Sequence, residues 1–192
     1  GQTSDATVAT LTASGSKAGS TINSSLTVST LASSHSLTGP SYNSATATVG
    51  ARTLTINFGT WSADPTAGGG QSFTSNGQDQ IQVTASSSTT LVDLRILINT
   101  AVTDSDNDGQ KDVNASIIFD GTNYMLMLKS QSGASYEMKV SDSNASPAYA
   151  YDATDGAQLT QRVAGTNSAF TVDGISMTRS SNSVEDLFDG FT

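Results

Sequence analysis

Short stretches in which apolar and polar residues alternate run along most of the chain and predict β-strands. Residues 5–37 alternate weakly, with single Val, Leu and Ile residues set among Ser and Thr, a pattern typical of edge-like strands with one polar face. From residue 53 the alternation is sharper, and Leu54, Ile56 and Phe58 would share one buried face. Residues 79–84 repeat the pattern. We therefore expect a sheet-rich fold.

One segment has the period of a helix instead. Its apolar residues recur at helical spacing and are Leu91, Leu94, Ile98 and Ala101. Thr90 precedes them, and Asp93 follows three residues later, as in a capping box whose side chains bond the free N–H groups of the first turn. The sequence thus predicts one amphipathic helix of about three turns.

Two hairpins are predicted from short turns between apolar runs. Residues 115–119 and 124–128 flank Asp120-Gly121, and residues 169–178 contain Asp173-Gly174 at their centre. Gly accepts positive φ without steric cost, so both Asp-Gly pairs favour tight turns. The second pair predicts a two-residue type I′ turn.

The last residues predict a short helical turn near the C-terminus. Asn182 would cap it, and Gly190 stands where a helix would stop. Its apolar face would consist of Val184, Leu187 and Phe188. The chain then ends at Thr192, within what reads as the start of another strand. We therefore expect it to be part of a longer polypeptide.

Composition narrows the classes of function. Ser and Thr make up 58 of 192 residues, which suits solvent-facing strand positions in an exported surface protein. The net charge of −9 opposes binding to nucleic acid or anionic lipid, because such binding depends on clusters of Lys and Arg. No apolar run approaches the roughly 18 residues that span a bilayer. Without Cys, stability must come from burial and sheet pairing rather than disulfides.

Several segments together resemble the flagellar filament cap family, hook-associated protein 2. The flagellin-type inserted motif of such proteins is similar to Thr89–Arg95, Ile98–Ala101, Val113–Ile117 and Leu126–Ser130 with Gly133. The segments that resemble the cap family rather than ordinary flagellins are Ala169–Ile175, Thr178–Asn182 and Val184–Asp186, with Lys17–Thr21 and Leu26–Ala32 at the other end. Two features depart from the family: Ser33-Ser34-His35 replaces a Gln-rich strand end, and residues 104–112 look like an insertion.

The resemblance implies a mainly β (α+β) fold with two antiparallel β-rich head domains, the second inserted into the first. Residues 1–47 and 163–192 would form a discontinuous, truncated inner domain, and residues 48–162 the inserted outer domain with its amphipathic helix. Val28 and Val172 would then belong to one sheet-bearing unit.

The resemblance also implies a structural role in the bacterial flagellum. In this family, terminal helices outside the present chain, with a long coiled coil, anchor to the filament end, and the heads associate as a ring under which exported flagellin assembles. The chain would be extracellular, exported by the flagellar apparatus, and without enzyme activity. Its partners would be other copies of itself, flagellin, and other hook-associated proteins or a host surface.

The sharpest chemical pattern is the acidic loop at residues 104–112. Its candidate calcium ligands are Asp104, Asp106, Asp108, Gln110 and Asp112. Acids two residues apart with a Gly at the sixth position have the spacing of an EF-hand loop, in which hard oxygen ligands converge on one ion. The twelfth position is Ala115 rather than the bidentate Glu, so a site here would be open and weak. The alternative is a solvated acidic loop between helix and strand.

Two further residues are candidates for function. His35 is the only histidine, and without a recognisable nucleophile motif it is better interpreted as a polar strand residue than as a catalytic base. Trp61 could anchor an interface, but packing over its own domain is the favoured interpretation. Neither predicts an enzyme.

Two other classes of function stay open beside the filament cap. One is a surface module of a flagellin or another hook-associated protein. The other is a calcium-dependent extracellular adhesin in which the acidic loop orders a binding face.

Overall fold

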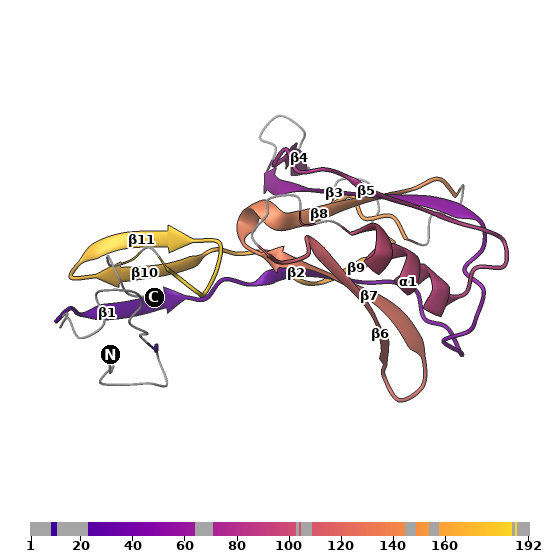
Figure 1. Cartoon of the computed structure of the whole chain (residues 1–192), viewed down its shortest axis with the longest axis horizontal. Coiled ribbons are helices and arrows are strands. Elements are labelled where there is room, and N and C mark those ends of the chain that lie inside the picture. The colour runs from indigo at the N-terminus through magenta and orange to yellow at the C-terminus, as the bar shows by residue number, and fades with distance from the viewer. Residues whose placement is uncertain are drawn as a thin grey trace.

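The computed structural model describes residues 9–10, 23–63, 71–102, 104, 109–144, 149–153, 158–185 and 187. It is elongated, with a small sheet at one end and a larger body of two sheets and a helix at the other (Figure 1). The fold is mainly β with antiparallel sheets and one α-helix among the described residues, as predicted.

The small sheet joins residues from both ends of the chain. Its strand order is β1 (Leu26–Thr30), β10 (Ser168–Val172) and β11 (Ile175–Arg179). Leu26 pairs with Val172 and Val28 with Phe170, so the two distant segments form one unit. The turn between β10 and β11 has positive φ at Asp173 (49°) and Gly174 (83°), which confirms the predicted type I′ hairpin.

The second sheet also combines distant segments. Its order is β6 (Val113–Phe119), β7 (Tyr124–Ser132), β2 (Ser34–Thr38) and β9 (Thr160–Val163). β6 and β7 form the predicted hairpin, with Phe119 paired to Tyr124. The hairpin projects from the body, away from the small sheet (Figure 1).

The third sheet is organised around the long strand β3 (Arg52–Ala63). Its neighbours are β4 (Gln71–Ser75), β5 (Ile81–Ala85) and β8 (Glu137–Asp142). β4 and β5 pair with successive halves of one edge of β3, and β8 pairs with the other edge. Gly59 permits the close approach of β4 to β3, because a Cβ there would lie 2.1 Å from the carbonyl oxygen of Thr74.

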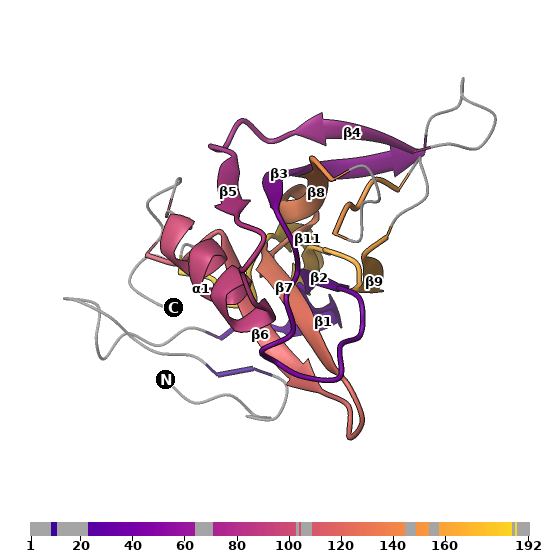
Figure 2. The same ribbon diagram turned by 90° about the vertical axis from the view of Figure 1, so that its right-hand side faces the viewer.

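Helix α1 (Leu91–Ala101) fills the space between these two sheets, where it contacts β5 and β6 (Figure 2). The predicted capping box is confirmed: Thr90 Oγ1 accepts the N–H of Asp93, and the Asp93 carboxylate accepts the N–H of Thr90. Leu91, Leu94 and Ile98 are fully buried. The predicted buried face of β3 is confirmed too, since Leu54, Ile56 and Phe58 belong to the same core.

The strand pairings do not by themselves fix domain boundaries, so the division at residues 47/48 and 162/163 stays a prediction. The pairings of β2 bear on it, however. Residues 34–38 fall within the range assigned to the inner domain, yet they pair with β7 and β9 in the larger body. The connection between the two bodies runs through residues 31–33 and 164–167, where Ser33 bridges Thr166.

The prediction that Asn182 caps a helical turn near the C-terminus is wrong. Its side chain Oδ1 accepts the N–H of Ala32 at 2.7 Å, and its Nδ2 donates to the Ala32 carbonyl at 2.9 Å. The amide therefore mimics a neighbouring strand instead of capping a helix. Part of the predicted turn, including Phe188 and Gly190, lies outside the described residues.

Within the part of the chain that the structure describes, no helix is long and apolar enough to cross a membrane.

Candidate interaction and metal sites

The acidic loop is described only in part, because Asp106 and Asp108 lie outside the described residues. Asp104 Oδ2 accepts the N–H of Gly109 at 2.9 Å, and Gly109 has φ 83°. The positive φ at Gly109 suits a sharp turn at the sixth position of the pattern. Among the described residues, no group of three His, Cys, Asp or Glu is placed to hold a metal ion.

Asp112 differs from the expected loop ligand. Its side chain is fully buried, and its backbone carbonyl oxygen accepts the N–H of Gln131 in β7. Lys111 donates from Nζ to the carbonyl of Asn99, in the last turn of α1, where a cation offsets the negative end of the helix dipole. The end of the loop is therefore built into the sheet and the helix, and the calcium assignment stays a prediction.

His35 is a buried connection between two sheets. Its ring is fully buried, and Nδ1 accepts the N–H of Met138 at 2.8 Å, which joins β2 to β8. The Tyr151 ring packs edge-on against it, 5.3 Å away. Burial lowers the pKa of His35 to about 4, and the neighbouring side chain of Gln161 only partly opposes that shift. The ring is therefore neutral at pH 7, and its geometry is that of a structural residue.

A second buried polar cluster contains Arg52, Asp142 and Tyr149, residues that sequence analysis did not single out. Arg52 Nη1 lies 2.7 Å from Asp142 Oδ2, with side-chain exposures of only 6% and 0%. The guanidinium also lies over the Tyr149 ring, 4.8 Å from its centroid. Tyr149 donates a hydrogen bond to the Tyr42 hydroxyl at 3.1 Å, and burial raises its pKa above the usual range. The cluster ties β3 and β8 to two irregular segments.

Trp61 packs over its own body, as predicted. Its Nε1 donates to the carbonyl of Met138 at 3.2 Å, and its ring lies 4.9 Å from that of Phe73. Lys139 Nζ lies 5.8 Å from the centroid of the indole ring and also pairs with Asp152. Neighbours on several sides thus surround the ring.

A hydrogen-bonded junction connects the small sheet to the larger body. It involves the segment Ser132–Ala134, which leads from the end of β7 into the short 3-10 helix η2 (Ala134–Tyr136). Gly133 N–H donates to the carbonyl of Ser33, and Ser132 Oγ donates to that of Ser180 at 2.7 Å. The Ala134 N–H donates to Asn167 Oδ1 at 2.9 Å. Hydrogen bonds therefore hold the larger body to both connecting segments and to Ser180, the residue that follows β11.

Several large apolar side chains are exposed. They are Leu26, Leu31, Ile96, Phe119, Val163 and Ile175. Phe119 belongs to the β6–β7 hairpin of the larger body and Ile175 to β11 of the small sheet, two elements that lie well apart in Figure 1. Such positions are candidates for contact with other proteins.

Comparison with known proteins identifies the architecture. No protein-family model and no curated protein matches the sequence. Among solved structures, the chain resembles the D2–D3 domains of the flagellar cap protein FliD from Serratia marcescens, with a TM-score of 0.71, 25% identity and coverage of 95% of this chain and 88% of that one. It also resembles FliD (HAP2) from Pseudomonas aeruginosa PAO1, with a TM-score of 0.62, 26% identity and coverage of 88% and 70%.

A third likeness shows how much of such a protein the chain spans. Against the D1–D2–D3 domains of FliD from Escherichia coli the TM-score is 0.71 at 23% identity, covering 95% of this chain and 49% of that one. The chain thus spans about half of that structure. The resemblance to flagellar cap head domains, predicted from sequence, is confirmed by these structural matches.

Proposed function

We propose that this chain, which has the fold of flagellar cap head domains, is the outer part of a bacterial flagellar filament cap. The observation that carries the proposal is the structural match over 95% of the chain, and the sheet formed from residues near both ends of the chain supports it. We propose no catalytic step, because the buried histidine and ion pair described above serve packing.

In the proposed role the head works by association. Copies of the full-length protein would form a ring at the filament tip, outside the cell, and flagellin subunits would assemble beneath it. Individual head contacts in such a ring can be weak, because a shared anchor raises the effective concentration of neighbouring heads. The hydrogen-bonded junction at Gly133 would set the angle at which each larger body meets its neighbour.

The test is the assembly state of the full-length protein. Sedimentation velocity should show a ring-sized oligomer, and the same protein added to growing filaments should promote flagellin incorporation. A control protein that lacks residues 31–182 would keep the anchoring segments without most of the head. A full-length protein that stays strictly monomeric at high concentration would contradict the proposal.

The calcium-dependent alternative has its own test. If the loop at residues 104–112 binds calcium in the folded state only, millimolar calcium should raise the melting temperature and chelator should reverse the effect. Asp104→Asn should abolish the response. An unchanged melting temperature of the wild-type chain would exclude the calcium site without affecting the cap proposal.

A further inference from the structure

Strand β6 has one paired edge and one that is closed only in part. β7 pairs along the first edge. At the second edge, Asn99 of α1 takes the place of a strand: its Nδ2 donates to the Ala115 carbonyl, and its Oδ1 accepts the Ala115 N–H, both at 2.8 Å. Along the rest of this edge, among the described residues, no strand pairs with β6.

The open part of the edge consists of Ile117 and Phe119. Backbone groups alternate in direction along an antiparallel strand. The backbone N–H and C=O of Ala115 point away from β7, so those of Ile117 and Phe119 do so as well. The turn agrees with this phase, since the Asp120 N–H donates to the Asn123 carbonyl across the hairpin. The Phe119 side chain is 55% exposed, and the hairpin tip stands clear of the body in two views (Figures 1 and 2).

We propose that two copies of the chain associate through this edge as an antiparallel pair related by a two-fold axis. Ile117 of each copy would lie opposite Phe119 of the other, and Ile118 opposite Ile118. The open part of the edge consists of the backbone groups of two residues. In this register, those of Ile117 pair with those of Phe119 in the second copy, and the reverse pair forms as well. Four backbone hydrogen bonds would form, and Ile and Phe side chains would pack across the strands.

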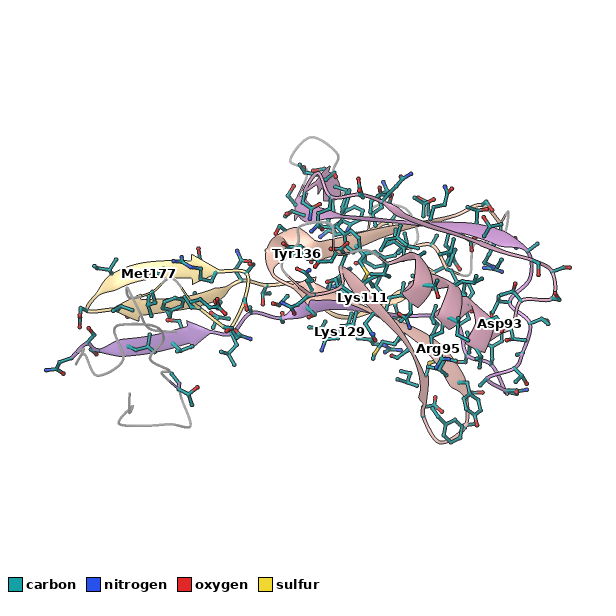
Figure 3. The ribbon with its side chains drawn as sticks, in the orientation of Figure 1. Asp93, Arg95, Lys111, Lys129, Tyr136 and Met177 are labelled. Carbon is teal, nitrogen blue, oxygen red and sulfur yellow. The ribbon has the colours of Figure 1, made fainter. Side chains whose placement is uncertain are left out.

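Charge favours a second copy at this edge in spite of the net charge of −9. No residue of β6 itself is charged. Arg95 lies one helical turn before Asn99, about 6 Å along the axis, and is thus level with Ile117. Figure 3 shows Arg95 at the hairpin side of α1.

The second copy supplies an anion for Arg95. In the proposed register, Asp120 of one copy lies opposite Ser116 of the other and next to its Arg95. Asp120 accepts the N–H groups of Thr122 and Asn123, both at 2.8 Å, and these bonds lower its pKa, so that it is ionised at neutral pH. Two Arg95–Asp120 pairs would therefore flank the shared strands.

This contact goes beyond the proposed cap function and does not depend on it. A two-fold contact closes on itself as a dimer, whereas a ring needs contacts that repeat head to tail. A result that contradicts the two-fold contact therefore does not contradict the proposed cap function, and the reverse also holds.

Cysteine cross-linking tests the register directly, because the chain has no Cys. Across the proposed axis the two Ile118 residues form a non-hydrogen-bonded pair with Cα atoms about 4.5 Å apart, within disulfide range. Ile118→Cys should therefore form a disulfide-linked dimer under mild oxidation. The matched control is Ser116→Cys, whose two copies would be about 13 Å apart along the strands and should cross-link at least tenfold more slowly. Equal cross-linking of both variants, or none, would overturn the proposal.

Association of the 192-residue chain gives a second measurement. Sedimentation equilibrium at concentrations up to millimolar should show a weak dimer of the wild type. Phe119→Lys should raise the dissociation constant at least tenfold. Ile175→Lys, at a similarly exposed apolar residue of the small sheet (63% exposed against 55% for Phe119), should leave it unchanged. A monomeric wild type, or a dimer that Phe119→Lys does not weaken, would contradict the two-fold contact.

Discussion

At the scale of single residues, His35 shows how burial converts a polar side chain into a pH-dependent structural element. The ring accepts the Met138 N–H, and a protonated Nδ1 could not do so. Its pKa of about 4 in the folded chain lies below the 6.5 that is usual for a histidine exposed to water. The unfolded chain thus binds a proton at a higher pH than the folded chain does. Stability from the neutral ring is therefore complete above pH 6.5 and is lost as the pH falls toward 4.

This difference predicts an acid-sensitive free energy of unfolding. Between pH 7.5 and pH 5 the wild type should lose about 2 kcal/mol through His35. His35→Gln keeps an acceptor for the Met138 N–H without titrating in this range, so it should be less stable at pH 7.5 but lose less on acidification. Urea unfolding at both pH values measures how much free energy of unfolding the wild type and the variant each lose. Parallel losses in wild type and variant would show that other groups cause the acid sensitivity.

At the scale of the elements, local chemistry sets the start of α1. Thr90 and Asp93 exchange side-chain and backbone hydrogen bonds and leave fewer free N–H groups in the first turn. Thr90→Ala should cost about 1 kcal/mol of stability, and Thr90→Ser, which keeps the hydroxyl, should cost much less. Urea unfolding of the two variants checks the difference. If Ser and Ala destabilise the chain equally, packing of the Thr methyl group rather than the cap is responsible.

The elements also show where prediction from sequence ends. The helix, the two Asp-Gly hairpins and the alternation of β3 depend on neighbouring residues, and all were predictable. Sheet partners depend on contacts between distant residues, and nothing local indicates that β2 lies between β7 and β9. Arg52 was a missed signal, because it is in phase with buried Leu54 and Ile56, and a charge on a buried face needs a partner.

The candidate sites were predictable to a smaller extent. The spacing of acids at residues 104–112 indicated a loop with a turn at Gly109, which the structure has. The spacing could not show that Asp112 is buried beside β7. Likewise His35 is in phase with buried Leu37 on β2, but its contact with Met138 crosses between two sheets. Whether an individual side chain is buried depends on how the whole body packs, and the sequence of one segment does not contain that information.

At the scale of the whole molecule, the relative orientation of the small sheet and the larger body depends on the junction at Gly133. This Gly has φ 116° and ψ 150°, a region that residues with a Cβ avoid. A Cβ at Gly133 would lie 2.8 Å from the Ser180 Cβ. A side chain at this position would therefore strain the backbone and push the two bodies apart.

The matched control is a glycine that also has positive φ but has open surroundings. Gly77 has φ 86°, and a Cβ there would meet no atom within 4 Å. Gly77→Ala should lose roughly 1 to 2 kcal/mol through positive φ, and Gly133→Ala roughly 1 to 3 kcal/mol through its backbone conformation, but only Gly133→Ala should disturb the junction. Comparison of the two variants separates local strain from loss of contact between the bodies.

Spin labels on opposite sides of the junction measure this difference. Thr178 on β11 and Gln82 on β5 are both exposed, and the chain has no Cys that would compete for labelling. The wild type and Gly77→Ala should give one narrow distance distribution, because bonds from Ser132, Gly133 and Ala134 hold the connecting segments. Gly133→Ala should broaden it, since the Ser180 contact cannot form. Equal widths in all three proteins would mean that the remaining junction bonds suffice to fix the orientation without close packing at Gly133.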